Sequence, residues 1–149
     1  MIEQAYAGTE QTASPDGGDM AALKYSRQRE EIKKHLAARR DHPTAEMIYT
    51  ELKEQDARLS LGTVYRNLSL LTQIGEVRKI QTQEGPDHFD GDISPHYHFV
   101  CRQCRQIFDL RVPEIGGRID EDARQQDFEV EQIQLTAYGL CGTCRGSGA

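Results

Sequence analysis

The most informative stretch of this sequence is HYHFVCRQC, residues 96–104. It ends in a Cys-x-x-Cys unit, and a second such unit, CGTC, occupies residues 141–144. The two units contain all the cysteines of the protein, which are Cys101, Cys104, Cys141 and Cys144. Each unit places two thiolates on one tight turn, and two units can close a tetrahedron around one ion. Four thiolates suit Zn²⁺ and leave no coordination position open, so we predict a structural zinc site.

Two other interpretations of the cysteine pairs have to be weighed. A redox dithiol needs only one Cys-x-x-Cys unit, which usually opens a helix, so the doubled unit favours a metal. A rubredoxin-like iron site uses the same four ligands, and the residues alone leave it open. The first twenty residues lack the apolar region of a secretory signal, and no run of eighteen apolar residues could span a membrane. We therefore expect a cytoplasmic protein, in which such pairs bind metal rather than form disulfides.

Nitrogen and oxygen donors surround the first cysteine pair. His96 and His98 stand two residues apart on a predicted strand, so both rings project from one face. Asp90 before them and Asp109 after them offer hard oxygen ligands. His42 lies far upstream, in a turn between two predicted helices. The alternative is that the strand histidines are merely half-buried and that His42 merely ends a helix.

The segment before residue 76 predicts three short helices. Polar residues that can cap a helix stand where each would begin, namely Ser26, Thr44 and Ser60. Apolar residues follow at spacings of three and four, which places them on one face of each helix. We expect the helices to span about 26–40, 44–55 and 61–74, with Gly75 as the stop. Three short helices, the third preceded by a turn, match a helix-turn-helix.

The remaining sequence predicts short strands and one further helix. Residues 76–80 can pair with His88-Phe89 across a turn at 84–86, which would form a β-hairpin wing. Strands are expected at 97–100, 107–110 and 128–135, and a helix at 113–126. The predicted fold class is α+β, with an N-terminal winged helix-turn-helix domain and a small C-terminal α/β dimerisation domain that holds the four-cysteine zinc site. We place these domains at 22–90 and 96–149, joined by a hinge at 91–95.

The charge is distributed unevenly along the chain. Residues 1–21 carry four acidic and no basic side chains and few apolar groups, so we expect a disordered acidic tail. The formal net charge is −6, which is unusual for a protein that binds nucleic acid. Residues 22–85, however, carry twelve Lys and Arg against nine Asp and Glu, a balance of +3. Any contact with DNA should therefore lie in this segment.

The third predicted helix offers side chains that can read DNA. Thr63, Tyr65, Arg66 and Asn67 lie on the face opposite its apolar residues. Arginine can pair with guanine or phosphate, and asparagine can read adenine in the major groove. Tyrosine can donate to phosphate or touch a thymine methyl group. The alternative is an ordinary solvated helix face, and the wing that follows favours DNA binding.

These motifs together resemble the Fur family of metal-dependent bacterial repressors, and within it the peroxide-sensing PerR branch. The resemblance runs from about Tyr25 to Cys144 in the family's order and spacing. The matching stretches are YSRQR at 25–29, HPTA at 42–45, GTVYRNL at 62–68, HFD at 88–90, HYHFVC at 96–101, IFD at 107–109 and the final cysteine pair. The resemblance implies a homodimer that binds a double-stranded, palindromic DNA operator, with no enzymatic activity and no small organic ligand.

The resemblance also implies a sensing mechanism. In the PerR branch three histidines and two aspartates bind Fe²⁺ or Mn²⁺, and here they would be His42, Asp90, His96, His98 and Asp109. Fe²⁺ reduces hydrogen peroxide, a ligand histidine is oxidised, and the repressor leaves DNA; His42 and His96 are the candidate targets. Iron-sensing Fur proteins tend to have Glu at the two Asp positions. The alternative within the family is an iron- or zinc-responsive repressor without peroxide sensing.

Two functions of other classes fit the sequence less well. A small metalloenzyme could use the His/Asp site for hydrolysis, but no further carboxylate or histidine is clearly left to act as general base. A zinc-ribbon interaction module would leave the Tyr65-Arg66-Asn67 helix and the wing without a purpose.

Overall fold

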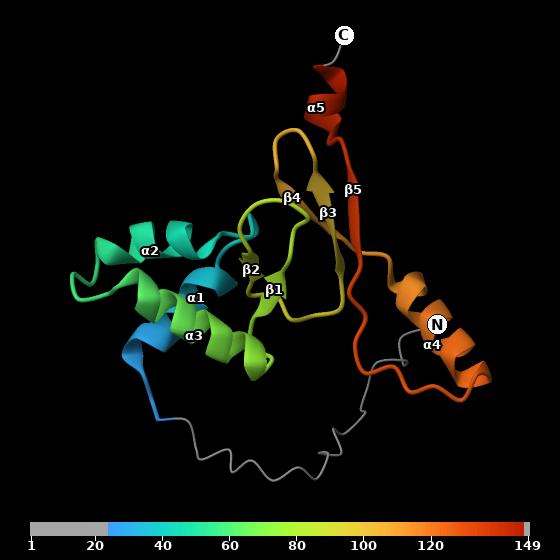
Figure 1. Ribbon diagram of the computed structural model, residues 1–149, viewed down its shortest axis with the longest axis horizontal. Helices are drawn as coiled ribbons and strands as arrows, with labels where there is room; N and C mark the ends of the chain where they lie inside the picture. Colours follow the sequence, from blue (N-terminus) through green and yellow to red (C-terminus); the bar gives the residue numbers. More distant parts are fainter. Residues whose placement is uncertain (1–23, 148–149) are drawn as a thin grey trace.

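Three helices form the N-terminal half of the computed structural model, which describes residues 24–147 (Figure 1). They are α1 (Arg27–Ala37), α2 (Ala45–Lys53) and α3 (Leu61–Gln73). Each begins at its predicted cap, because the side chains of Ser26, Thr44 and Ser60 accept a hydrogen bond from a backbone N–H of the first turn. The three predicted helices are confirmed. The predicted acidic tail at 1–21 lies outside the described residues.

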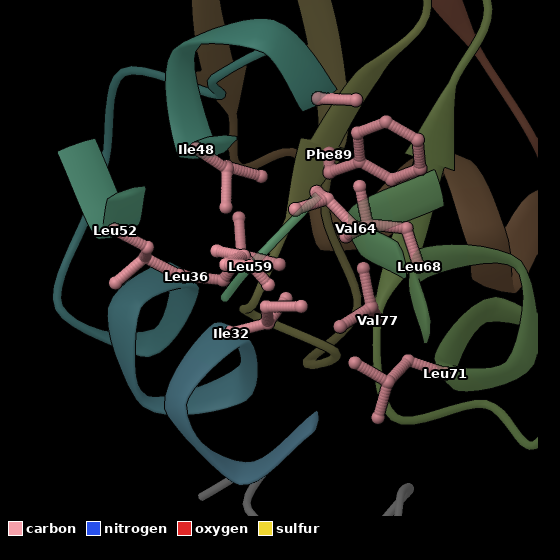
Figure 2. Close-up of a cluster of buried hydrophobic side chains, with 11 residues drawn as sticks. Ile32, Leu36, Ile48, Leu52, Leu59, Val64, Leu68, Leu71, Val77 and Phe89 are labelled. Atoms are coloured by element: carbon pink, nitrogen blue, oxygen red, sulfur yellow. The ribbon is translucent and has the colours of Figure 1, made fainter. Parts of the chain in front are cut away.

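The apolar faces of these helices meet in one core, shown in Figure 2. Ile32, Ile48 and Leu68 are completely buried there. Val77, just before the hairpin that follows α3, and Phe89, within that hairpin, close the same core. Each such side chain contributes ~1.5–3 kcal/mol by leaving water, so this core is what fixes α3 against its neighbours.

The hairpin after α3 is confirmed, and it lies between two cores. Strands β1 (Arg78–Ile80) and β2 (His88–Asp90) pair antiparallel, with Ile80 opposite His88. While Val77 and Phe89 face the helices, Ile80 is buried in a second cluster with Val100 and Ile107. The hairpin therefore contacts both halves of the chain.

A three-stranded sheet forms the C-terminal half. Its order is β4-β3-β5, with β3 (Tyr97–Cys101) antiparallel to β4 (Ile107–Leu110) and parallel to β5 (Thr136–Gly139). Helix α4 (Pro113–Gln125) follows β4 and forms despite its paired glycines, with proline at its first turn. A short helix, α5 (Gly142–Gly146), carries the second cysteine pair and was not predicted. The α+β fold class is confirmed.

The third predicted strand is wrong in position. Residues 128–135 have no regular structure, and the strand lies directly after them, in β5. The alternating apolar residues suggested a strand, but Phe128 is 61% exposed, so no core in the described chain covers the start of this segment. The partner strand β3 begins only at Tyr97, and the contact of this segment with it is the hydrogen bond from His98 N–H to the Leu135 carbonyl. Alternating apolar residues indicate that one face of a segment is apolar, but a strand forms only where a partner strand is available to pair with it.

The connection between hairpin and sheet, residues 91–95, is anchored on both sides. Gly91 lies so close to α1 that a Cβ atom would come within 2.7 Å of the backbone carbon of Leu36. The guanidinium of Arg78 donates to the carbonyls of Ile93 (2.8 Å) and His96 (3.2 Å). Among residues 24–147, no helix is long and apolar enough to cross a membrane.

Candidate metal centres

The structure brings together the five predicted nitrogen and oxygen ligands. They come from three parts of the chain. The first is the turn between α1 and α2, the second is the end of β2, and the third is the paired strands β3 and β4 together with the residue that precedes β3. The ligand atoms of His42, Asp90, His96, His98 and Asp109 all lie within 4.8 Å of one another. The first four side chains are buried and Asp109 is half-buried. The cluster therefore joins the helical half to the sheet.

The distances within this cluster match those around a single ion. His96 Nε2 lies 2.8 Å from Asp90 Oδ2 and 3.1 Å from His98 Nε2. His42 Nε2 lies 2.8 Å from Asp109 Oδ1 and 3.6 Å from Asp90 Oδ2. Neighbouring ligands in an octahedron with metal bonds of ~2.1 Å are ~3.0 Å apart. Each of these residues already presents one ligand atom at such a spacing.

Hydrogen bonding fixes which nitrogen of His96 can bind a metal. Its Nδ1 donates to the Ser94 carbonyl at 2.8 Å, because a carbonyl can only accept. In the neutral ring, Nε2 then carries a lone pair that points at the carboxylate of Asp90. Two acceptors that face each other are satisfied by a cation between them. In contrast, His42 Nδ1 has no partner, alone among the buried side-chain nitrogens and oxygens of residues 24–147.

The electrostatics of the cluster also favour a cation. Burial opposes a charge on Asp90, but hydrogen bonds from His42, His98 and the Asp92 N–H hold its pKa far below the ordinary value. Burial likewise disfavours the charged form of His42, but the carboxylates of Asp90 and Asp109 raise its pKa overall. The site thus keeps its carboxylate anionic, which suits a divalent N/O-preferring metal such as iron or manganese.

The four cysteines form a second, separate cluster, with all Sγ atoms within 4.8 Å. Cys104 Sγ and Cys141 Sγ are 3.8 Å apart, far beyond the ~2.05 Å of a disulfide bond. Thiolates around tetrahedral zinc with bonds of ~2.3 Å are ~3.8 Å apart, so the residues fit Zn²⁺. Cys101 ends β3 and Cys104 lies on the turn that follows, where Arg105 adopts a left-handed φ of 63°. In the second pair, Cys141 caps the N-terminus of α5 and Cys144 lies within that helix.

Backbone amides prepare this cluster for a metal. The N–H groups of Cys104 and Cys141 lower the pKa of the Cys101 thiol to about 6. The neighbouring Cys141 sulfur and burial raise the pKa of Cys144 to about 12, because four thiolates repel one another without a cation. A bound Zn²⁺ relieves that repulsion.

The predicted DNA-contacting side chains lie on α3, and none of them belongs to either cluster. Tyr65 and Arg66 are exposed, whereas Thr63 and Asn67 are half-buried. Tyr65 donates its hydroxyl to Glu46 of α2 at 2.5 Å, and Asn67 donates to the Thr63 carbonyl at 3.0 Å. No pattern in the sequence links Glu46 to Tyr65.

Two residues around the N/O cluster, Asp92 and Arg111, were also missed from the sequence, whereas His88 was predicted as a structural residue of the wing. Asp92, Arg111 and His88 each hydrogen-bond to one of its ligands. The one available signal was spacing, because Asp92 and Arg111 each follow a ligand aspartate by two residues.

Comparison with known proteins gives a consistent result. The model of the Ferric uptake regulator family matches residues 20–138. The peroxide-responsive repressor PerR of Staphylococcus epidermidis is 30% identical over 128 residues, covering 86% of this chain and 85% of the relative. PerR of Staphylococcus aureus strain Mu50 is 32% identical over 125 residues, covering 84% of each protein.

Solved structures of such regulators have a similar fold. The ferric uptake regulator of Helicobacter pylori, described with three functional metal-binding sites, has a TM-score of 0.74 at 25% identity, with 85% of both chains covered. The peroxide stress regulator of Campylobacter jejuni has a TM-score of 0.71 at 29% identity, covering 78% of this chain and 88% of the other. The manganese-bound ferric uptake regulator of Pseudomonas aeruginosa also reaches 0.71, at 30% identity, covering 80% and 91%.

Proposed function

The chain belongs to the ferric uptake regulator family of metal-responsive regulators, and from this premise we propose that it is a DNA-binding repressor that senses hydrogen peroxide. The observation that carries the proposal is the His42, Asp90, His96, His98 and Asp109 cluster, which supplies only nitrogen and oxygen donors. Similarity to two peroxide-responsive repressors supports the sensing function.

The cluster would couple metal binding to the arrangement of the two halves. His42 belongs to the proposed winged-helix domain at 22–90, whereas His96, His98 and Asp109 belong to the proposed dimerisation domain at 96–149. A metal bound by all five ligands favours the arrangement in which His42 meets the sheet. It therefore acts as an allosteric effector through its higher affinity for that arrangement. The connection at 91–95 is the proposed hinge.

DNA binding would use the exposed face of α3. In a homodimer the relative position of two α3 helices sets the spacing of the half-sites that they can reach, so the operator should be palindromic. Tyr65, Arg66 and Asn67 are the proposed contacts, with Thr63 beside them. The four cysteines hold structural zinc in the C-terminal half and take no part in sensing.

Loss of a ligand would be the signal. Fe²⁺ held by the five ligand residues would pass electrons from an imidazole to hydrogen peroxide, so that one peroxide oxygen adds to the ring and the other leaves as water, whereas Mn²⁺ does not readily react with peroxide. His42 and His96 are the proposed targets of oxidation, and an imidazole that has gained an oxygen atom binds metal less well. His42 then no longer ties the helical half to the sheet, and affinity for DNA falls.

Peroxide treatment of the iron-loaded and manganese-loaded proteins tests this function. Mass spectrometry should find one added oxygen atom on a peptide with His42 or His96 in the iron form alone, together with weaker DNA binding. Intact histidines, with oxidation confined to methionine or cysteine, would contradict peroxide sensing. If metal still controlled DNA binding in that case, the protein would be an iron- or zinc-responsive repressor, the alternative that the similarity to ferric uptake regulators also supports.

A further inference from the structure

Both ligand aspartates turn a single oxygen toward the three imidazoles. Asp90 presents Oδ2, and its Oδ1 accepts the backbone N–H of Asp92 at 2.8 Å. Asp109 presents Oδ1, and its Oδ2 accepts from the guanidinium of Arg111 at 3.4 Å. In each carboxylate the outer oxygen is thus engaged by a protein donor.

Arg111 is held in place by Asp92. It stands two residues after Asp109, so its side chain leaves the chain on the same face. Arg111 Nη2 donates to Asp92 Oδ2 at 2.9 Å, and the other oxygen of Asp92 accepts the Ser94 N–H at 2.9 Å. The Ser94 hydroxyl also donates to that oxygen, and this hydrogen bond, followed by that from Arg111, keeps the pKa of Asp92 well below its ordinary value. Asp92 therefore acts on both ligands, through its backbone on Asp90 and through Arg111 on Asp109.

We propose that Arg111 and Asp92 are positioning residues that restrict each ligand aspartate to one metal bond and so keep one coordination position of the regulatory metal free. The inference rests on the proposed metal site. Five donor atoms leave one position vacant around an ion that prefers six ligands. Rotation about the last bond of an aspartate is soft, so without Arg111 the outer oxygen of Asp109 can turn inward and fill that position. The pair decides whether a small molecule can reach the metal.

The effect of Arg111 should be confined to the metal site. Arg111 is 54% exposed, so its ion pair with Asp92 adds little to overall stability. Its effect should instead appear at Asp109, which is 21% exposed and has no other donor for its outer oxygen among the described residues. Removal of the guanidinium should therefore change the metal's surroundings while leaving the fold intact.

Water bound to Mn²⁺ reports the free position directly. We would measure the relaxation of water protons by zinc-replete, Mn²⁺-loaded wild type, Arg111→Ala, Asp92→Ala and Arg111→Lys. Arg27→Ala is a matched control, because Arg27 forms an exposed ion pair with Glu31 in α1, at the start of the helical half. Wild type and control should show one exchanging water on the metal. Arg111→Ala and Asp92→Ala should lose that contribution, and Arg111→Lys, which can still donate to Asp109, should regain part of it.

Several results would overturn the inference: wild type without a metal-bound water, Arg111→Ala indistinguishable from Arg27→Ala, or Arg111→Lys no better than Arg111→Ala. A variant that combines Arg111→Ala and Asp92→Ala should lose no more of the metal-bound water signal than either single variant, since both substitutions remove the same restraint. If Arg111→Ala failed to fold, Asp92→Ala would test the inference in its place. This variant releases Arg111 but keeps the backbone N–H that binds Asp90. The measurement uses neither DNA nor peroxide, so its failure is distinct from failure of the proposed function.

Discussion

His88 Nδ1 donates a hydrogen bond to the backbone carbonyl of His42 at 2.7 Å. His42 has a left-handed φ of 52°, which is unfavourable for a residue with a Cβ atom. The next residues extend the contact, since Phe89 N–H donates to the Pro43 carbonyl at 2.9 Å and His88 forms a β-bridge with Thr44. Strand β2 therefore carries one metal ligand, Asp90, and also holds the turn that carries another.

Replacement of His88 by alanine should weaken binding of the regulatory metal by ~10-fold, because such supporting residues typically have effects of this size. His88→Asn should retain part of the affinity, since its amide can still donate to the carbonyl. Competitive Mn²⁺ titration measures the change. The control is His35→Ala, which removes a half-buried histidine that pairs with Glu51. Equal affinities for His88→Ala and the control would show that the hydrogen bond does not position His42.

The stability of the protein without its regulatory metal should decrease as the pH rises. The pKa of His42 is raised above its ordinary value of 6.5 in the folded state. Its proton therefore stabilises the fold fully below that pH, and this contribution is lost as the pH rises through the folded-state pKa. The lowered pKa of Asp90 acts in the opposite sense, but only in acid below its ordinary value of 3.8. Above pH 6.5, and until the pH has passed the raised pKa of His42, this residue should thus set the slope.

Thermal unfolding of zinc-replete protein, free of other metals, measures this dependence. His42→Gln should unfold at a temperature that changes less across the same range. A slope as steep as that of wild type would assign the effect to another group.

Replacement of Cys101 by serine should remove the zinc and cost the fold and the dimer together. Structural zinc sites in small domains bind with ~10 kcal/mol or more, and that free energy is folding free energy. Metal analysis, thermal unfolding and the association state should all change together. Thr143→Ala is the control, because Thr143 lies between Cys141 and Cys144 and contributes no thiolate. A folded, dimeric variant without zinc would refute a structural role.

Loss of a DNA-reading side chain should weaken operator binding. Arg66→Ala or Asn67→Ala should cost ~1–3 kcal/mol if the residue contacts a base. Fluorescence anisotropy at one fixed salt concentration would measure the affinity for a duplex selected from random sequences. Arg118→Ala, an exposed arginine of α4, controls for the loss of one positive charge. An equal loss in this control would mean that charge alone, not the face of α3, sets affinity.

Local signals were sufficient for much of this fold. Ser26, Thr44 and Ser60 determine where helices begin because a cap acts within one turn. The metal ligands could be proposed because cysteine and histidine spacing is a short-range pattern, and the resemblance to a family added His42. The prediction of a strand at 128–135 was wrong because alternating apolar residues do not specify a partner strand.

Long-range pairs left no pattern to detect. Arg111 and Asp92 are nineteen residues apart, and either alone is an ordinary surface charge. Nothing in the sequence links His88 to the backbone of His42, forty-six residues away. Such contacts depend on the completed packing of the hairpin against both halves, so they become visible only in three dimensions.

The burial of Ile80 has a consequence for how the protein melts. Ile80 is 4% exposed in the cluster of Val100 and Ile107, while its neighbours in the hairpin belong to the helical core. The two cores therefore share one hairpin, and neither can unfold without exposing apolar surface of the other. Calorimetry should record a single cooperative transition, and Ile80→Ala, at a cost of ~2–5 kcal/mol, should split it into two.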